Sequence, residues 1–369
     1  MKQSVRIILW VCCAALILAA PVLVSSPRML DEVADRLQEE TEDLGREEET
    51  EEIGSESKLL RFLVPSACAE KEVVEEELLE DEETEKKSGA AYALPWDFTV
   101  PPEANPAGFA ADSYEDESIQ VRMEHREENG VTWHIAWVTV QSPTQLRTAV
   151  ANPEKPKGKK TYHVQDIAKR NHAVVAINSD YMSNDPEKTT YEIRQTTEIR
   201  AKSNRYKDVL IINEEGDFHF ILANPEMTSK KYAEWMKEEL ASYTAEHRII
   251  NAFTFGPALV VNGEKQQTSE EYGYNTNRPE PRTAIGQMGP LSYVMVIAEG
   301  RGESAGVTHQ QLADFMAGLG CQQAFNLDGG NSTELVFGET LYKGAPNAAQ
   351  RSQSDIIYFA TAVPEENWK

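Results

Sequence analysis

The pattern of apolar and polar residues predicts strands and short helices from about Tyr114 onwards. Runs of branched and aromatic residues bounded by Gly, Pro, Asn or Asp are typical of strands, whereas apolar residues three or four apart are typical of helices. Strands are predicted at 132–140, 146–150, 173–177, 209–213, 218–222, 258–261, 283–288, 293–298 and 356–360. Of these, 132–140 and 146–150 are predicted to be the first strands. Helices are predicted at 163–170 and 230–243, the second with its aromatic residues in the core.

The most informative stretch is 321–337, with the sequence CQQAFNLDGGNSTELVF. An apolar run ends at Asp328, Gly329 and Gly330, and a second apolar run follows, which predicts a strand, a glycine turn and a return strand. A helix at 308–320 is predicted to precede it. Asp328 would then lie at the carboxyl end of a strand, where glycines let a ligand approach the backbone. The alternative is a tight hairpin that simply favours Asp-Gly.

The N-terminal residues have a different composition. Residues 7–24 form an uninterrupted apolar stretch of 18 residues, preceded by Lys2 and Arg6. This length just spans a bilayer, and basic residues before it orient the rest of the chain outwards. We therefore expect a signal anchor within 1–30 and an extracytoplasmic domain. A cleaved signal peptide, which would give a secreted protein, is the alternative.

Residues 31–90 carry 23 acidic and seven basic side chains, a net charge of −16. Such a segment repels itself and buries little apolar surface, so it predicts a disordered acidic linker, placed at 31–113. The linker serves either as a spacer or as a partner-binding tail. The single globular domain is then placed at 114–369, with an α/β (α+β) fold of mixed β-sheets and a few packed helices.

Charge and cysteine content exclude some classes of partner and binding site for the domain. Residues 91–369 carry a net charge of −12, which argues against nucleic acid as a partner because phosphate binding needs clustered Lys and Arg. Cys321 is the one cysteine in 114–369, so the domain has no internal disulfide and no zinc-binding pattern. No cofactor is evident, and a divalent cation is possible without a sequence signature.

Four further clusters hold residues suited to chemistry. They lie at 178–181 after a buried strand, at 255–257 (Phe-Gly-Pro), at 278–286 before and within a strand, and at 299–309 before a helix. A glycine-rich loop next to a helix N-terminus is a typical anion site, and an arginine supplies a planar fork for phosphate.

Taken in order, these clusters resemble the phosphodiester glycosidase family. The motifs are Ile-Asn at a strand end, FGP, PRTAIG, EGRG followed by Ser and Gly, and NLDGGNST; the resemblance covers roughly 164–362 and is strongest at 281–333. This chain departs from the family pattern at Glu299, at Asn331 and in the Ser-Asp-Tyr that follows Asn178. The family includes a glycosidase that removes N-acetylglucosamine from a phosphodiester on mannose.

The resemblance implies hydrolysis of a sugar 1-phosphodiester, in a cell-surface polysaccharide or glycolipid. Because the leaving phosphate is already a stable anion, the site needs mainly a carboxylate and groups that hold the phosphate. The carboxylate is assigned first to Asp328, with Asp180 or Glu334 as a second. Asn178 is expected to bond a sugar hydroxyl, and Arg282 with the backbone N–H groups of 304–308 to hold the phosphate. The remaining predicted substrate-binding residues are Gly256, Arg301, Ser304, His309, Gly329, Gly330, Ser332 and Thr333.

These residues also bear on three other functions. In a haloacid-dehalogenase phosphatase the nucleophile would occupy the position of Asn326, which cannot form an aspartyl-phosphate. A calcium loop of EF-hand type needs glycine where this chain has Thr333. A non-catalytic module that binds polysaccharide through the same pocket stays open as the alternative.

The predicted anchor has a direct test. Because residues 7–24 are long enough to span a bilayer, the full-length protein should sediment with membranes and stay there in high salt. Recovery of a soluble protein that begins near residue 26 would instead identify a cleaved signal peptide.

Overall fold

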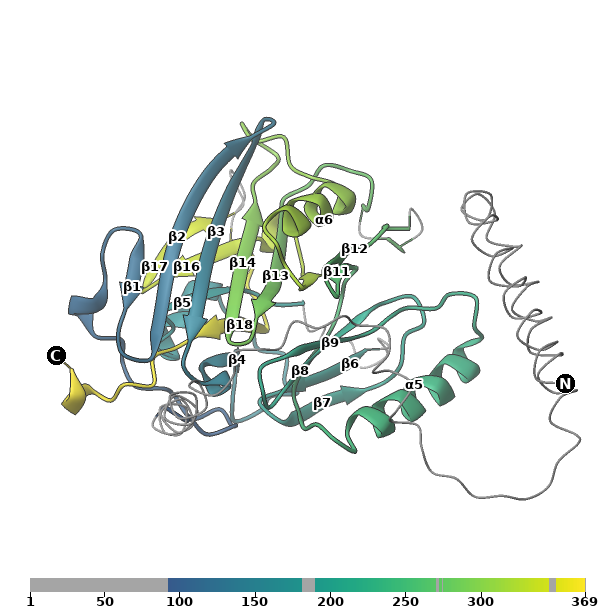
Figure 1. Cartoon of the computed structure of the whole chain (residues 1–369), viewed down its shortest axis with the longest axis horizontal. Coiled ribbons are helices and arrows are strands. Elements are labelled where there is room, and N and C mark those ends of the chain that lie inside the picture. The colour runs from purple at the N-terminus through teal and green to yellow at the C-terminus, as the bar shows by residue number, and fades with distance from the viewer. Residues whose placement is uncertain (1–91, 181–189, 270–271, 274, 345–349, 369) are drawn as a thin grey trace, which may run out of the picture. The chain divides into compact units, whose positions relative to one another are not determined.

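The computed structural model describes residues 92–180, 190–269, 272–273, 275–344 and 350–368, which form three antiparallel sheets and three α-helices (Figure 1). The predicted anchor and most of the predicted linker lie outside these residues. Within the described ranges, no helix combines the length and apolar character that a bilayer crossing requires.

The largest sheet has eight strands in the order β1-β2-β3-β14-β13-β15-β11-β12. Its strands are β1 (Ser113–Glu115), β2 (Ile119–Glu128), β3 (Val131–Val140), β11 (Ala258–Val261), β12 (Glu264–Lys265), β13 (Arg282–Gly289), β14 (Ser292–Ala298) and β15 (Gln323–Asn326). Its outer face is covered by α6 (His309–Gly318), which lies against β11, β12 and β15, and whose Leu312, Ala313 and Met316 belong to the apolar cluster on that face.

Two five-stranded sheets complete the fold. One has the order β7-β6-β10-β8-β9, and the other has the order β17-β16-β5-β18-β4. The first contains β6 (Tyr191–Arg194), β7 (Thr197–Ala201), β8 (Val209–Asn213), β9 (Phe218–Ile221) and β10 (Ile249–Thr254). The second contains β4 (Leu146–Val150), β5 (Val175–Asn178), β16 (Glu334–Phe337), β17 (Thr340–Gly344) and β18 (Asp355–Phe359).

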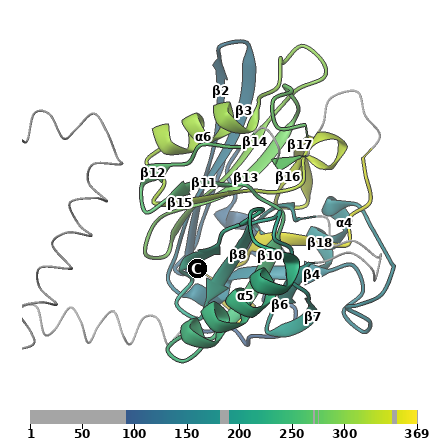
Figure 2. The same cartoon turned by 90° about the vertical axis from the view of Figure 1, so that its right-hand side faces the viewer.

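Each five-stranded sheet has one helix on its outer face (Figure 2). The sheet with β8 packs against α5 (Ser229–Tyr243), and the sheet with β5 packs against α4 (Val164–Arg170). Short 3-10 turns lie at η2 (Pro106–Gly108), η3 (Pro143–Gln145), η5 (Gly330–Ser332) and η6 (Glu365–Asn367).

One central core joins the inner faces of all three sheets. Met295 and Phe325 enter it from the eight-stranded sheet, Phe253 from the sheet with β10, and Ile177 and Leu335 from the sheet with β5. Burial of this apolar surface is the main stabilising term of the fold. It also fixes the strand ends relative to one another, and the candidate site lies at several of those ends.

The α+β class predicted from the sequence is confirmed, in a mostly β form. Every described strand pairing is antiparallel. The predicted helices and strands are found within two residues of their expected ends, and Gly216 lies in the hairpin between β8 and β9 with a φ of 82°. Strand 132–140 is not the first strand, because β1 and β2 precede it.

Part of the segment assigned to the linker is held against the sheets. The guanidinium of Arg147 is fully buried and donates to the carbonyls of Pro95 (2.9 Å), Asp97 (2.8 Å) and Thr99 (3.1 Å). It also donates to the Tyr358 hydroxyl at 3.2 Å. Residues 95–99 thus supply acceptors to a buried cation that would otherwise be costly.

This arrangement predicts two different effects of shortening the chain. A chain starting at residue 92 should keep the melting temperature of the whole protein, because the acidic residues before it have little to bury. A chain starting at residue 114 removes the three carbonyl partners of Arg147 and should be less stable by on the order of 3 kcal/mol. Thermal unfolding followed by circular dichroism measures both, and equal melting temperatures would refute the role given to 95–99.

Candidate active site

The Asp328 turn lies where the chain passes from one sheet to another. β15 ends at Asn326 in the eight-stranded sheet, and β16 begins at Glu334 in the sheet with β5. Between them η5 makes a tight turn, and the backbone N–H of Asp328 donates to the carbonyl of Ser179 at 3.2 Å. The two strands are therefore not a hairpin, which excludes the alternative considered for this sequence.

Both glycines of the turn are required by close contacts. A Cβ at Gly329 would lie 2.6 Å from the carbonyl oxygen of Pro281, closer than any side chain allows. Gly330 has a φ of 62°, and a Cβ there would lie 3.1 Å from Nη2 of Arg301. The missing side chains let Pro281 and Arg301 approach the turn. The sequence pattern was interpreted as room for a ligand to approach the backbone, whereas the close neighbours of these two glycines in the structure are protein groups.

The buried side chain of Asn178 holds this turn in place. Its Nδ2 donates to the carbonyl of Asp328 at 2.7 Å and to that of Ser179 at 3.2 Å. Its Oδ1 accepts from the Thr283 hydroxyl at 2.9 Å and from the backbone N–H of Glu334 at 3.2 Å. The side chain is 0% exposed and its bonding capacity is used. Asn178 therefore positions the turn and does not face a ligand.

The Asp328 carboxyl is mostly buried, with 14% of the side chain exposed. Oδ1 accepts a hydrogen bond from the Gly329 N–H at 3.0 Å. Oδ2 lies 3.6 Å from Nη1 of Arg351, and none of the described residues hydrogen-bonds it. Burial raises the pKa of Asp328, against the opposing effects of Ser332, Arg351, Gly329 and Arg282. A desolvated carboxylate with one oxygen lacking a hydrogen bond is suited to stabilise developing positive charge.

Arg301 lies over the same turn, on the loop that follows β14. Its Nη1 donates to Oδ1 of Asn331 at 2.7 Å and its Nε to Oε2 of Glu280 at 2.5 Å, while 44% of the side chain stays exposed. Ser304 fastens this loop, because its hydroxyl donates to the carbonyl of Glu299 at 2.8 Å. Arg301 is thus half-exposed next to Asn331 and Gly330, whereas Ser304 is internal.

Arg351 is the second half-exposed cation of the turn. Its Nη1 donates to the Ser332 hydroxyl at 3.1 Å, and 45% of its side chain is exposed. Two guanidinium groups therefore contact the segment from Asp328 to Ser332, each with surface left for a ligand.

Arg282 is placed differently from the expectation. It is 4% exposed and donates to the carbonyls of Asn275 (2.8 Å), Arg278 (3.2 Å) and Val307 (3.2 Å). Burial lowers its pKa to about 10. These bonds connect the segment before β13 with the loop before α6. The guanidinium therefore stabilises the backbone next to the turn and is not exposed at the site.

Three backbone N–H donors just before α6 are already hydrogen-bonded within the protein. The N–H groups of Ala305, Val307 and Thr308 donate to the Gly130 carbonyl (2.9 Å), the Glu280 carbonyl (3.0 Å) and Gln311 Oε1 (2.9 Å). Thr308 and Gln311 form a reciprocal capping box. These three donors, which the sequence suggested for phosphate binding, are thus used inside the protein.

His309 and Gly256 lie around Tyr272. The His309 imidazole is 0% exposed, and burial together with the nearby Arg282 lowers its pKa to about 2, so it stays neutral. Gly256 has a φ of 76°, and a Cβ there would lie 2.2 Å from the Tyr272 hydroxyl. Its N–H donates to the carbonyl of Asn326 at 3.2 Å, which attaches it to the end of β15.

Asp180 belongs to a buried ion-pair network. Its Oδ1 lies 2.5 Å from Nη2 of Arg194, and its Oδ2 accepts from the Thr254 N–H at 3.0 Å. Nε of Arg194 donates to Oδ2 of Asp355 at 2.7 Å, so the network joins two sheets. Burial raises the pKa of Asp180, while Arg194 opposes the rise. This geometry gives Asp180 a structural role.

Glu334 begins β16 and Thr333 immediately precedes it, and each is 1% exposed. Among the described residues, no group hydrogen-bonds the Glu334 carboxyl oxygens or the Thr333 hydroxyl. Burial raises the pKa of Glu334 to about 7, against a lowering effect of the Val164 N–H at the start of α4. Such a carboxyl exchanges a proton near neutral pH, so Glu334 remains the second carboxylate of interest.

The comparison with protein families identifies the domain. The phosphodiester glycosidase family model matches residues 171–360, which is more than half of the chain. The chain belongs to the phosphodiester glycosidase family. The match includes β5, β13, β15 and β16, whose ends meet at Asp328.

One relative and two solved structures illustrate the similarity. An uncharacterised SPbeta prophage-derived protein, YomE of Bacillus subtilis, is 28% identical over 195 residues. That region is 53% of this chain and 29% of the relative, so the chain spans under a third of YomE.

A zebrafish N-acetylglucosamine-1-phosphodiester α-N-acetylglucosaminidase catalytic domain, auto-inhibited by its pro-peptide, aligns with a TM-score of 0.49 and 15% identity. The alignment covers 71% of this chain and 87% of that one. A hypothetical protein from Synechocystis aligns with a TM-score of 0.48 and 16% identity, covering 68% and 64%.

Within the phosphodiester glycosidase domain, the structure separates the predicted site residues into two groups. Asp328, Gly329, Gly330, Ser332 and Arg301 come together at the turn. The others support this turn, or lie behind it or beside it in the protein: Asn178, Asp180, Gly256, Arg282, Ser304, His309, Thr333 and Glu334.

Three residues of the site were not predicted, namely Arg351, Asn331 and Glu280. Glu280 lies inside the PRTAIG-containing cluster and Asn331 inside NLDGGNST, so the motifs themselves contained the signal. Arg351 lies in a polar stretch without a motif. In the described part of the chain, no group of three or more His, Cys, Asp or Glu is arranged to hold a metal ion.

The four hydrogen bonds of Asn178 predict a strong effect of its removal. Asn178→Ala would leave the Asp328 carbonyl, the Glu334 N–H and the Thr283 hydroxyl without their partner in a buried site. We expect a loss of roughly 2–4 kcal/mol in the free energy of unfolding, measured by urea titration. Asn171→Ala is the matched control, because Nδ2 of Asn171 donates to a single carbonyl, that of Ile167, at 2.8 Å. Equal losses in the two variants would show that Asn178 does not organise the turn.

Proposed function

We propose that this domain hydrolyses a sugar 1-phosphodiester, with Asp328 as the carboxylate at the reacting sugar carbon. The observation that supports this proposal is the Asp328 turn. A mostly buried carboxyl lies there, with one oxygen that no described residue hydrogen-bonds, and two half-exposed guanidinium groups contact the same turn, Arg351 at Asp328 and Ser332 and Arg301 at Asn331. Family membership supports a hydrolase of this general class.

The chemistry needs two kinds of group, and the turn offers both. Cleavage of the bond between C1 and its oxygen leaves a phosphate monoester, and positive charge develops at C1. Arg301 and Arg351 are suited to bind the phosphate, because a guanidinium presents paired donors to phosphate oxygens. Asp328 is suited to stabilise C1, either as nucleophile, as electrostatic partner or as base for water.

Arg282 enters this proposal in a supporting role. Its donors are directed to backbone carbonyls, and it lies behind the turn. Glu334, whose pKa burial raises to about 7, is 1% exposed at the start of β16 and enters the proposal only as the alternative carboxylate to Asp328.

We further propose that the domain acts outside the cytoplasm, on a cell-surface polysaccharide or glycolipid. The apolar stretch at 7–24 supports that location, and sedimentation with membranes tests it.

The experiment that tests the function compares Asp328→Asn with the parent protein on soluble sugar 1-phosphodiesters. The substitution keeps size and hydrogen bonding but removes the charge. We expect kcat to fall by roughly two or more orders of magnitude, with a modest change in KM. Arg351→Ala should mainly raise KM, by about tenfold, because it removes a phosphate contact.

Arg122→Ala is the matched control for the arginine variant, since Arg122 is exposed and pairs with Glu124 on β2 at 2.9 Å. All variants are first shown to be folded by circular dichroism. Full activity of a folded Asp328→Asn variant would exclude Asp328 as the catalytic carboxylate and leave Glu334 as the candidate. A parent protein without turnover, whose ligand binding survives Asp328→Asn, would instead establish a non-catalytic polysaccharide-binding module.

A further inference from the structure

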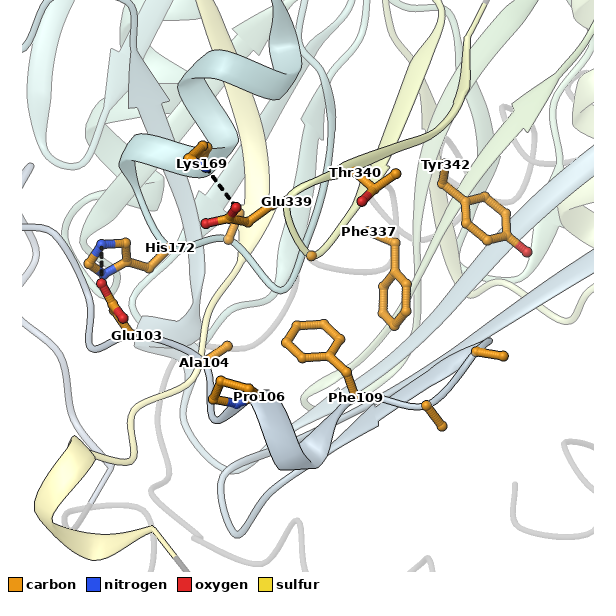
Figure 3. Close-up of a pocket in the computed structure, with 14 residues that line it drawn as sticks. Glu103, Ala104, Pro106, Phe109, Lys169, His172, Phe337, Glu339, Thr340 and Tyr342 are labelled. Carbon is orange, nitrogen blue, oxygen red and sulfur yellow. Dashed lines mark hydrogen bonds and ion pairs between the residues drawn. The ribbon is translucent and has the colours of Figure 1, made fainter.

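A cavity of about 730 Å³ lies at the other end of β16 from the Asp328 turn (Figure 3). Its walls come from residues 103–111, from the end of α4 with the two residues that follow Asn171, and from the β16–β17 hairpin. β16 spans about 10 Å, so the cavity is separate from the site already described. Its volume is in the range of small-ligand sites.

One side of this groove is aromatic. Phe109 and Phe337 contact edge to face with ring centroids 5.4 Å apart, and Tyr342 lies 6.4 Å from Phe337. Gly338 has a φ of 57°, and a Cβ there would lie 3.2 Å from the Phe109 ring. The hairpin turn is thus fitted against Phe109.

The segment that contributes Phe109 is fixed by Tyr114. The Tyr114 ring packs against Phe109 at 4.5 Å, and its hydroxyl accepts from the Asn105 N–H at 3.1 Å and donates to Asp116 at 2.8 Å. The groove is therefore already formed before any ligand binds, which lowers the entropic cost of binding.

The other side of the groove is polar and exposed. Nζ of Lys169 lies 2.7 Å from Oε2 of Glu339, and Nε2 of His172 lies 3.6 Å from Oε1 of Glu103 (Figure 3). Both carboxylates are more than half exposed, so each keeps acceptor capacity for a ligand. The exposed hydroxyl of Thr340 lies between these groups and the aromatic side.

His172 occupies a backbone position that usually belongs to glycine. It follows the C-terminal end of α4 with a φ of 50°. This conformation directs Nδ1 to the carbonyl of Pro101 at 2.9 Å and the other ring nitrogen to the groove. Strain of this kind is concentrated at binding sites.

We propose that this groove binds a neutral saccharide unit. The apolar face of a sugar ring packs on aromatic side chains, while its hydroxyls bond to carboxylates, amines and the Thr340 hydroxyl. Two acidic groups opposite one lysine and one histidine disfavour an anionic ligand such as phosphate. A lipid chain would place hydrocarbon against four ionisable groups, which is unfavourable.

This inference deepens the proposed function, on which it rests for the class of ligand. A polysaccharide that is cleaved at Asp328 would be held by another of its sugars in the groove. The groove would then favour polymeric over small substrates without contacting the reacting bond.

The test uses chitotetraose and maltotetraose, two neutral oligosaccharides without a phosphodiester, so the proposed reaction does not consume them. Binding to the full chain is measured by isothermal titration calorimetry. Ala110 is exposed and lines the groove, so Ala110→Trp should fill it and weaken binding by about tenfold or more. Ala107→Trp is the matched control: Ala107 is exposed on the same segment and lines a different surface hollow, so affinity should stay within about twofold.

Hydrolysis of a small sugar 1-phosphodiester is measured in the same samples, and Ala110→Trp should leave it unchanged. Failure of both oligosaccharides to bind, or equal binding by Ala110→Trp and the parent, would overturn the assignment of the groove to a saccharide. The hydrolysis assay would still test the role of Asp328 independently. Binding of dodecylphosphocholine that Ala110→Trp blocks, without saccharide binding, would assign the groove to lipid and also overturn the proposal. Absence of hydrolysis with intact saccharide binding would overturn only the proposed function.

Discussion

The position of Asp328 depends on four hydrogen bonds made by one buried amide, that of Asn178. This side chain lies at the end of β5 and joins β13, the turn after β15 and the start of β16. β13 and β15 pair in one sheet and β5 and β16 in another, and among the described strands no ladder joins the first pair to the second. Since buried amides rarely lack partners, the four bonds make one arrangement of the strand ends much more stable than others.

The charged groups around this point are divided by burial. Arg282, Arg194 and Asp180 are almost fully buried and bond to carbonyls or to each other, because a desolvated charge without partners is costly. Arg301 and Arg351 keep nearly half of their side chains in solvent and still contact the turn. A ligand can therefore reach the exposed pair without breaking the buried network. Sequence motifs do not distinguish these two groups, since both consist of the same residue types.

The local signals in the sequence were sufficient for much of the fold. The start of α6 follows from the capping box of Thr308 and Gln311, and its end from Gly320, which has a φ of 91°. The β8–β9 hairpin follows from Gly216. β2 was missed because half of its residues are polar and face solvent, so it lacks an apolar run. β10 was missed because all six of its residues are buried and the stretch shows no alternation.

The candidate site was predictable where its residues are neighbours in sequence. Asp328, Gly329 and Gly330 form one turn, so a single motif identifies them, although the close contacts of the two glycines come from Pro281 and Arg301. The role of Asp180 depends on Arg194 and Asp355, which reach it only through the packing of two sheets. Arg351 likewise approaches Asp328 through the fold alone. Such contacts have no periodicity or spacing that a single sequence displays.

An anionic substrate poses a problem for a domain with a net charge of −12. The overall field repels a phosphodiester, and at physiological salt this repulsion extends over about 8 Å. Binding must therefore come from cations within contact distance. Arg301 and Arg351 both lie at the turn, and each keeps nearly half of its side chain in solvent beside an acidic partner, Glu280 and Asp328 respectively. A bound phosphate would therefore meet the guanidinium donors that face solvent, at contact distance, where the repulsion by the rest of the domain is outweighed by paired charge-assisted hydrogen bonds.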